Sequence, residues 1–142
     1  RNVTPTFIWK ALNNMPLRLD NNGETTRDFI FVEDIANGLI CCALYGKKGG
    51  VYNLASGKEI SIGTLARTIC KLTNSKSELL LKPKRSWDNS GRRYGDPTKA
   101  FKEINFKANI SFDEGIQKTI KWTKENYKLI KSCIDKHEYF MN

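Results

Sequence analysis

The sequence has no apolar run that could cross a membrane. Its longest runs, such as residues 39–45, are far shorter than the roughly 20 residues that a membrane-spanning helix needs. The N-terminus also lacks the basic-then-apolar layout of a secretion signal. We therefore expect a soluble cytoplasmic protein with no membrane partner.

Cysteine and histidine are scarce, and their spacing excludes the usual cross-links. The 4 cysteines contain no C-x-x-C pair, and Cys41 and Cys42 are adjacent in an apolar helical stretch, where they resemble small buried hydrophobes. We expect reduced thiols, with neither a disulfide nor a metal site. The 1 histidine, His137, is close to the C-terminus, and we expect it to be solvated rather than catalytic.

Acidic residues are outnumbered, which favours an anionic partner. Lys and Arg total 24 against 15 Asp and Glu, giving a formal net charge of +9. The lysines of one predicted C-terminal helix recur every three or four residues, as on a solvated helix face: Lys118, Lys121, Lys124, Lys128, Lys131 and Lys136. Arginines instead gather in one loop beside Trp87 and Tyr94. Such a local patch favours a compact anion over a nucleic acid, so we expect no nucleic-acid partner.

Helix and strand signals alternate, which predicts an α/β or mixed α+β domain. Helices are expected from a Thr4 cap to Asn14, over 33–45, from a Ser61 cap to Leu72, from Asp96 to Glu103, and from a Ser111–Glu114 capping box towards the C-terminus. Strands are expected over 17–19, 27–32, 51–55 and 78–82. These strands are few and short for so many amphipathic helices. A larger sheet completed by residues outside the chain would explain the mismatch.

The most informative stretch is a spaced pattern of a glycine, an Arg-Asp-aromatic triplet, a strand and an aspartate at a helix start: Gly23, Arg27, Asp28, Phe29, Ile30, Val32 and Asp34. It resembles the signature of extended short-chain dehydrogenase/reductase enzymes that act on nucleotide sugars. Three later segments, 51–57, 87–100 and 115–122, resemble further motifs of that family in the same order. The similarity runs from residue 1 to about residue 127.

The resemblance implies the small substrate-binding lobe of a Rossmann-type enzyme, with the Rossmann core absent. The family's dinucleotide-binding glycine motif does not occur here, so NAD or NADP would be bound by another part of the parent protein. The family's catalytic residues also precede this segment. Tyr127 and Lys131 satisfy the spacing Y-x-x-x-K, but we interpret them as part of a helix face.

The resemblance also implies a role and an organisation for the chain. Residues 1–142 would form one C-terminal domain, in which 30–56 packs on the cofactor domain and 128–142 is a helical tail. The expected role is the substrate-binding half of an NAD-dependent nucleotide-sugar epimerase or dehydratase, inactive alone and in a homo-oligomer. The alternative is a non-catalytic nucleotide-binding or interaction module of the same origin.

Two arginines are the leading candidates for binding the substrate's diphosphate. Guanidinium groups bind phosphate oxygens through paired, charge-assisted hydrogen bonds. The resemblance places Arg27 and Arg93 at this diphosphate, with Arg92 and Arg85 as neighbours in the loop. The alternative for Arg27 is a surface ion pair with Asp28 or Glu24.

The remaining candidates would bind the nucleoside and the sugar. Asp88 suits the ribose hydroxyls because a carboxylate accepts two hydrogen bonds, although it could equally cap its loop. The resemblance assigns Leu17 and Leu19 to an extended segment whose backbone pairs with the edge of the base. It assigns Asn2 and Val3 to a loop whose amides contact the phosphate-proximal sugar.

Overall fold

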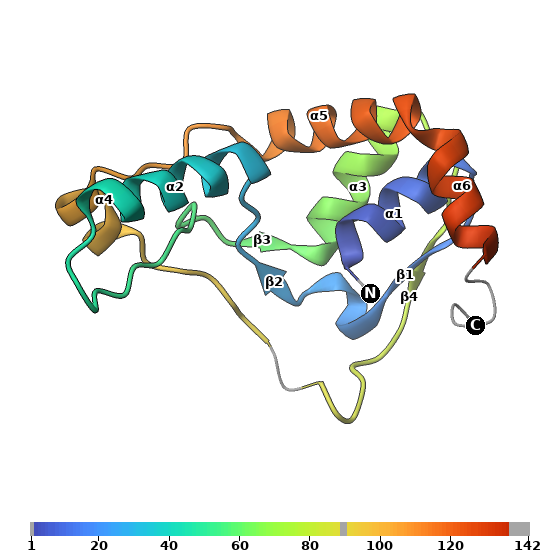
Figure 1. The fold of residues 1–142 in the computed structure, drawn as a ribbon. Helices are drawn as coiled ribbons and strands as arrows, with labels where there is room; N and C mark the ends of the chain where they lie inside the picture. Colours follow the sequence, from blue (N-terminus) through green and yellow to red (C-terminus); the bar gives the residue numbers. More distant parts are fainter. Residues whose placement is uncertain (1, 89–90, 137–142) are drawn as a thin grey trace.

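The computed structural model describes residues 2–88 and 91–136 and confirms a mixed α/β fold with few, short strands (Figure 1). The order is α1 Val3–Leu12, β1 Leu17–Leu19, a 3-10 turn η1 Asp20–Gly23, β2 Thr26–Arg27, α2 Val32–Tyr45, β3 Ile60–Ser61, α3 Ile62–Thr73, β4 Leu79–Leu81, α4 Thr98–Ile104, α5 Phe112–Glu125 and α6 Tyr127–Lys136. In this part of the chain no helix is both long and apolar enough to span a bilayer.

Local capping chemistry fixes two helix starts where the sequence predicts them. The Ser61 hydroxyl accepts the Thr64 amide at 3.0 Å, and the Ser111 hydroxyl accepts the Glu114 amide at 3.3 Å. The predicted Thr4 cap is wrong. Helix α1 begins at Val3 with Asn2 as its cap residue, so Thr4 lies in the first turn.

Two predicted strands are shorter or absent. Of the expected strand over 27–32 only Arg27 is in a strand, the two-residue β2, because the chain leaves the pairing with β3 at Asp28 and enters α2 at Val32. Residues 51–55 form no strand. The Tyr52 hydroxyl in that segment instead donates to Glu103 of α4 at 3.1 Å, so the segment packs through side chains.

The single C-terminal helix expected from periodicity is two helices. The chain turns at Asn126, whose amide side chain donates to the Trp122 carbonyl at 3.0 Å. Beyond the turn, Tyr127 stacks on Trp9 with ring centroids 4.7 Å apart and donates its hydroxyl to Asn13 at 2.6 Å. These contacts hold α6 against α1, and they divide the six lysines between α5 and α6.

The main core lies between the apolar faces of α1, α3 and α5 and strand β1. Strand β1 pairs in parallel with β4, from Leu17↔Leu79 to Leu19↔Leu81, and β2 pairs antiparallel with β3. Burying both leucines of β1 leaves Arg18 on the opposite face of the strand. The buried residues of this core are Phe7, Ile8, Ala11, Leu17, Leu19, Leu65, Ala66, Ile69, Ile116 and Ile120.

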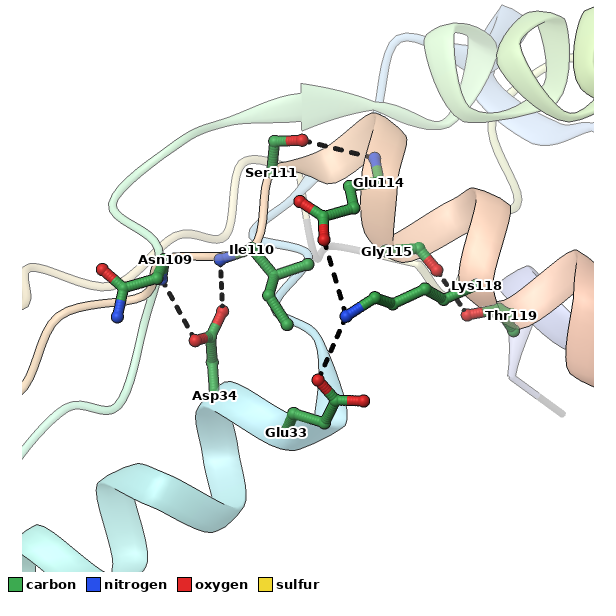
Figure 2. Close-up of polar contacts among 9 residues, drawn as sticks. All are labelled: Glu33, Asp34, Asn109, Ile110, Ser111, Glu114, Gly115, Lys118 and Thr119. Carbon is green, nitrogen blue, oxygen red and sulfur yellow. Dashed lines mark hydrogen bonds and ion pairs between the residues drawn. The ribbon is translucent and has the colours of Figure 1, made fainter.

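A second, smaller core holds α2 and α4 at the other end of the molecule (Figure 1). Phe106, fully buried, is its largest side chain. The carboxylate of Asp34 on α2 is 5% exposed and accepts the amides of Asn109 at 3.1 Å and Ile110 at 2.9 Å (Figure 2). Lys118 of α5 pairs with Glu33 of α2 at 3.1 Å, so α2 is joined to the segment that starts α5.

Candidate functional site

A pocket of about 970 Å³ lies at the N-terminus of α1, between β1, β2 and the loop that follows β4. Its charged lining residues are four cations and three carboxylates: Lys10, Arg18, Arg27, Arg85, Asp20, Asp28 and Asp88. Asn2 and Val3 line it from the start of α1. The first turn of a helix leaves backbone amides without helical partners, which adds to the attraction for an anion.

Asp20 joins two of the pocket arginines. Its carboxylate accepts Arg18 Nε at 2.8 Å through one oxygen and pairs with Arg85 Nη2 at 2.6 Å through the other. The Arg85 guanidinium also lies 5.2 Å from the centre of the Trp87 ring. This carboxylate therefore holds strand β1 and the loop after β4 together along one wall of the pocket.

Asp28 connects three segments behind the pocket. Its carboxylate accepts the Ser56 amide at 3.1 Å, the Ser56 hydroxyl at 2.5 Å, the Gly57 amide at 3.0 Å and the Gly95 amide at 3.3 Å. Hydrogen bonds to a charged acceptor are the stronger class. The turn after 51–55 and the end of the loop at Gly95 are thereby fixed to the residue that follows β2.

Arg27 reaches the pocket from β2. Its Nη1 donates to the Thr26 carbonyl at 2.6 Å and to the Gly91 carbonyl at 3.4 Å. The Gly91 carbonyl also accepts the Thr26 amide at 3.2 Å. Arg27, a half-buried residue, therefore contacts the returning loop while it lines the pocket.

Glu59 and Arg92 form a paired contact beside β2. Arg92 donates Nε to one carboxylate oxygen at 2.8 Å and Nη2 to the other at 2.6 Å, and the Thr26 hydroxyl donates to the same carboxylate. The Arg92 guanidinium, and then the Thr26 hydroxyl, lower the pKa of Glu59 to about 2. The carboxylate in turn raises the pKa of Arg92. The contact is ionised throughout the neutral range.

The structure places five of the residues that the sequence predicts for the site along one pocket. They are Asn2, Val3, Arg27, Arg85 and Asp88. Arg92 is occupied with Glu59, and Arg93 is exposed; neither lines this pocket. Arg93 therefore does not line the pocket that Arg27 lines, and the roles of all these side chains stay predictions.

The β1 residues contribute differently from the way the sequence suggests. The Leu17 amide donates to the Glu78 carbonyl at 2.8 Å, and the Leu19 carbonyl accepts the Lys82 amide at 2.9 Å. The backbone groups of both leucines therefore face the edge of β1 that pairs with β4. Backbone groups of successive residues in a strand face opposite edges. The edge away from β4 is therefore that of Arg18.

The sequence patterns do not select four charged residues of the pocket as site residues: Lys10, Arg18, Asp20 and Asp28. A signal existed for Arg18, because the apolar-basic-apolar order of 17–19 puts its side chain on the face opposite the buried leucines. Asp20 pairs with Arg18 two residues away, but its second partner, Arg85, lies far along the chain. His137 lies outside the described residues, and the part of the chain described contains no cluster of His, Cys, Asp or Glu that could hold a metal ion.

The model of the family described as GDP-mannose 4,6 dehydratase matches residues 1–119. A UDP-glucuronate 4-epimerase from Thermodesulfobacterium geofontis is 33% identical over 89% of this chain and 39% of its own length. The human dTDP-D-glucose 4,6-dehydratase is 27% identical over 88% of this chain and 37% of its own.

Two solved structures are also similar to this chain. The Bordetella bronchiseptica enzyme WbmF, in complex with NAD+ and UDP, is 58% identical with a TM-score of 0.88, over 98% of this chain and 42% of that one. An epimerase from Methanothermobacter thermautotrophicus is 35% identical with a TM-score of 0.88, over 93% and 40%. The chain thus spans about two fifths of the length of each of these four proteins.

Proposed function

Because this chain belongs to the GDP-mannose 4,6-dehydratase family, we propose that it is the nucleotide-sugar-binding part of an NAD-dependent epimerase or dehydratase. The observation that carries the proposal is the pocket at the start of α1, where Arg18, Arg27 and Arg85 lie around a space of about 970 Å³. A bound UDP in the similar enzyme WbmF supports a nucleoside diphosphate as the ligand class.

In this proposal the chain binds and orients the substrate. Arg27 and Arg85 bind diphosphate oxygens through charge-assisted hydrogen bonds, and Asp88 accepts from the ribose hydroxyls. The outer backbone edge of Arg18 faces the base. Holding the nucleotide at several points fixes the position of the attached sugar, which is the contribution of binding groups to catalysis in a separate domain.

The nicotinamide cofactor would be bound elsewhere in the parent protein. The sequence contains no G-x-G-x-x-G turn, so its residues do not fit the dinucleotide site of a Rossmann domain. When bound, that cofactor would supply hydride transfer. We therefore propose that the chain by itself binds nucleotide without converting it.

The proposed contact with the cofactor domain is the outer face of α2 and the segment after it. Its large apolar side chains are mostly solvent-exposed, Leu39 by 60% and Leu44 by 67%. The others are Val32, Ile40, Tyr45 and Val51. Contiguous apolar patches of this kind mark surfaces that bind another protein domain.

Calorimetry with UDP and with uridine tests the proposed function. We expect the purified chain to bind UDP at least about tenfold more tightly than uridine, because one or two charge-assisted hydrogen bonds contribute about 1.5 to 3 kcal/mol. Equal affinity for the two would show that the pocket does not recognise phosphate. An absence of heat for both would reject nucleotide binding by this chain.

A further inference from the structure

We propose that Glu59 and Arg92 form a clamp that positions Arg27 in the pocket. Arg92 then affects ligand affinity indirectly, through the position of Arg27, and does not contact the ligand. The inference rests on the proposed function, because it names residues that set the affinity of the same pocket. Neither Glu59 nor Arg92 lines that pocket. Their contacts explain how they affect it.

The clamp is anchored on the antiparallel pair of strands β2 and β3. Glu59 precedes β3, and its carboxylate accepts the hydroxyl of Thr26, which is in β2. The Glu59 side chain is only 21% exposed, and this hydrogen bond holds its carboxylate beside the β2–β3 strand pair. This carboxylate, partly buried and hydrogen-bonded to the Thr26 hydroxyl, is thus a preformed acceptor for a cation from the loop.

Arg92 supplies that cation in a geometry that fixes its direction. The two nitrogen-to-oxygen distances of 2.8 and 2.6 Å form a two-point contact, which constrains a guanidinium more than a single bond does. The Arg92 guanidinium carbon also lies 5.6 Å from the centre of the Tyr94 ring. The Arg92 guanidinium is therefore directed at Glu59, next to β3, and does not line the pocket.

The residue next to Arg92 transmits this contact to Arg27. The Gly91 carbonyl accepts the Thr26 amide at 3.2 Å and Arg27 Nη1 at 3.4 Å. Gly91 has a φ of +39°, a backbone conformation that other residues rarely adopt. With Arg92 held by Glu59, the Gly91 carbonyl stays beside the Arg27 guanidinium, which keeps that guanidinium at the pocket wall.

The sequence could not reveal this role. Arg92 and Arg93 are adjacent basic residues in one loop, and both are candidates for the diphosphate. In the structure Arg92 pairs with Glu59, the residue before β3, and Glu59 belongs to none of the sequence motifs. The clamp predicts that Glu59, an acidic residue, strengthens the binding of an anion.

A double-mutant cycle tests the clamp. We measure UDP affinity for Glu59→Gln, Arg92→Gln and the double variant, and we expect about a 3- to 5-fold weakening in each single variant and no further loss in the double one. The exchanged pair Glu59→Arg with Arg92→Glu should recover most of the affinity. Lys121→Gln, which breaks an exposed pair with Glu125 on α5, is the control and should leave affinity unchanged.

The opposite pattern would identify Arg92 as a ligand-binding residue. In that case Arg92→Gln weakens binding strongly, Glu59→Gln leaves it unchanged or improves it, and the exchanged pair does not recover it. Any of these results overturns the clamp.

Hydrogen exchange separates a failure of the clamp from a failure of the proposed function. Without ligand, Glu59→Gln and Arg92→Gln should each speed exchange of the Thr26 and Gly95 amides, while amides of α3 keep their protection. If the wild-type chain binds no UDP, this measurement alone decides. Unchanged exchange at Thr26 and Gly95 in both variants would refute the clamp.

Discussion

Replacing Arg27 with glutamine should weaken UDP binding by about 10- to 100-fold. Arg27 lines the pocket from β2, and a guanidinium contributes paired hydrogen bonds to phosphate that an amide cannot replace. The loss of one such charged contact costs about 1.5 to 3 kcal/mol, which corresponds to that range in Kd. Because the lost contact is with phosphate, uridine affinity should change little.

Arg67→Gln is the matched control for this prediction. Arg67 lies on α3, is exposed and is not among the residues that line the pocket, yet its substitution removes the same charge and side chain. Affinity in the control should stay within about twofold of wild type, since surface substitutions away from a site have small effects. Equal losses in the two variants would mean that overall charge, and not Arg27, determines binding. Thermal unfolding of both variants checks that the fold is retained.

Placing a glutamate on the outer face of α2 should abolish self-association of the isolated chain. Leu39 and Leu44 are mostly exposed, so two copies of the chain can bury this face against each other in a symmetric dimer. One substitution then changes the interface at two positions. Burying a leucine contributes about 1.5 to 3 kcal/mol. Leu44→Glu should therefore weaken a self-association constant by about 100-fold or more, as measured by sedimentation equilibrium.

Leu129→Glu provides the comparison, because Leu129 is 63% exposed on α6, away from α2. It should leave self-association unchanged. A wild-type chain that is monomeric at every concentration would contradict the uncovered-face interpretation. That result would favour a module that is stable and complete by itself.

An element of the fold can be predicted from the sequence when the contacts that determine it join residues close together in the chain. The Ser61 and Ser111 caps depend on residues three positions away, and the sequence locates both. The strand expected to run to Val32 stops at Arg27, because Asp28 is needed to accept amides from Gly57 and Gly95. No periodicity within 27–32 contains that information.

In the candidate site, too, the sequence selects some residues that line the pocket and cannot show the effect of distant contacts on others. Motif resemblance selects Arg27, Arg85 and Asp88, which the structure places along one pocket. It also selects Arg92, whose partner Glu59 is 33 positions away. Basic residues in one loop look equivalent in a sequence. Only the tertiary contacts distinguish Arg85, which lines the pocket, from Arg92, which pairs with Glu59 beside β3.

An NMR titration of the isotope-labelled chain with UDP tests directly whether the pocket binds the nucleotide. Binding in the pocket predicts saturable shifts in the amides of its wall, at Val3, Arg18, Arg27 and Asp88, and little change along α6. Shifts confined to the lysine-bearing faces of α5 and α6, or none at the pocket, would contradict it. They would show that the basic surface attracts anions without the pocket that defines the proposed function.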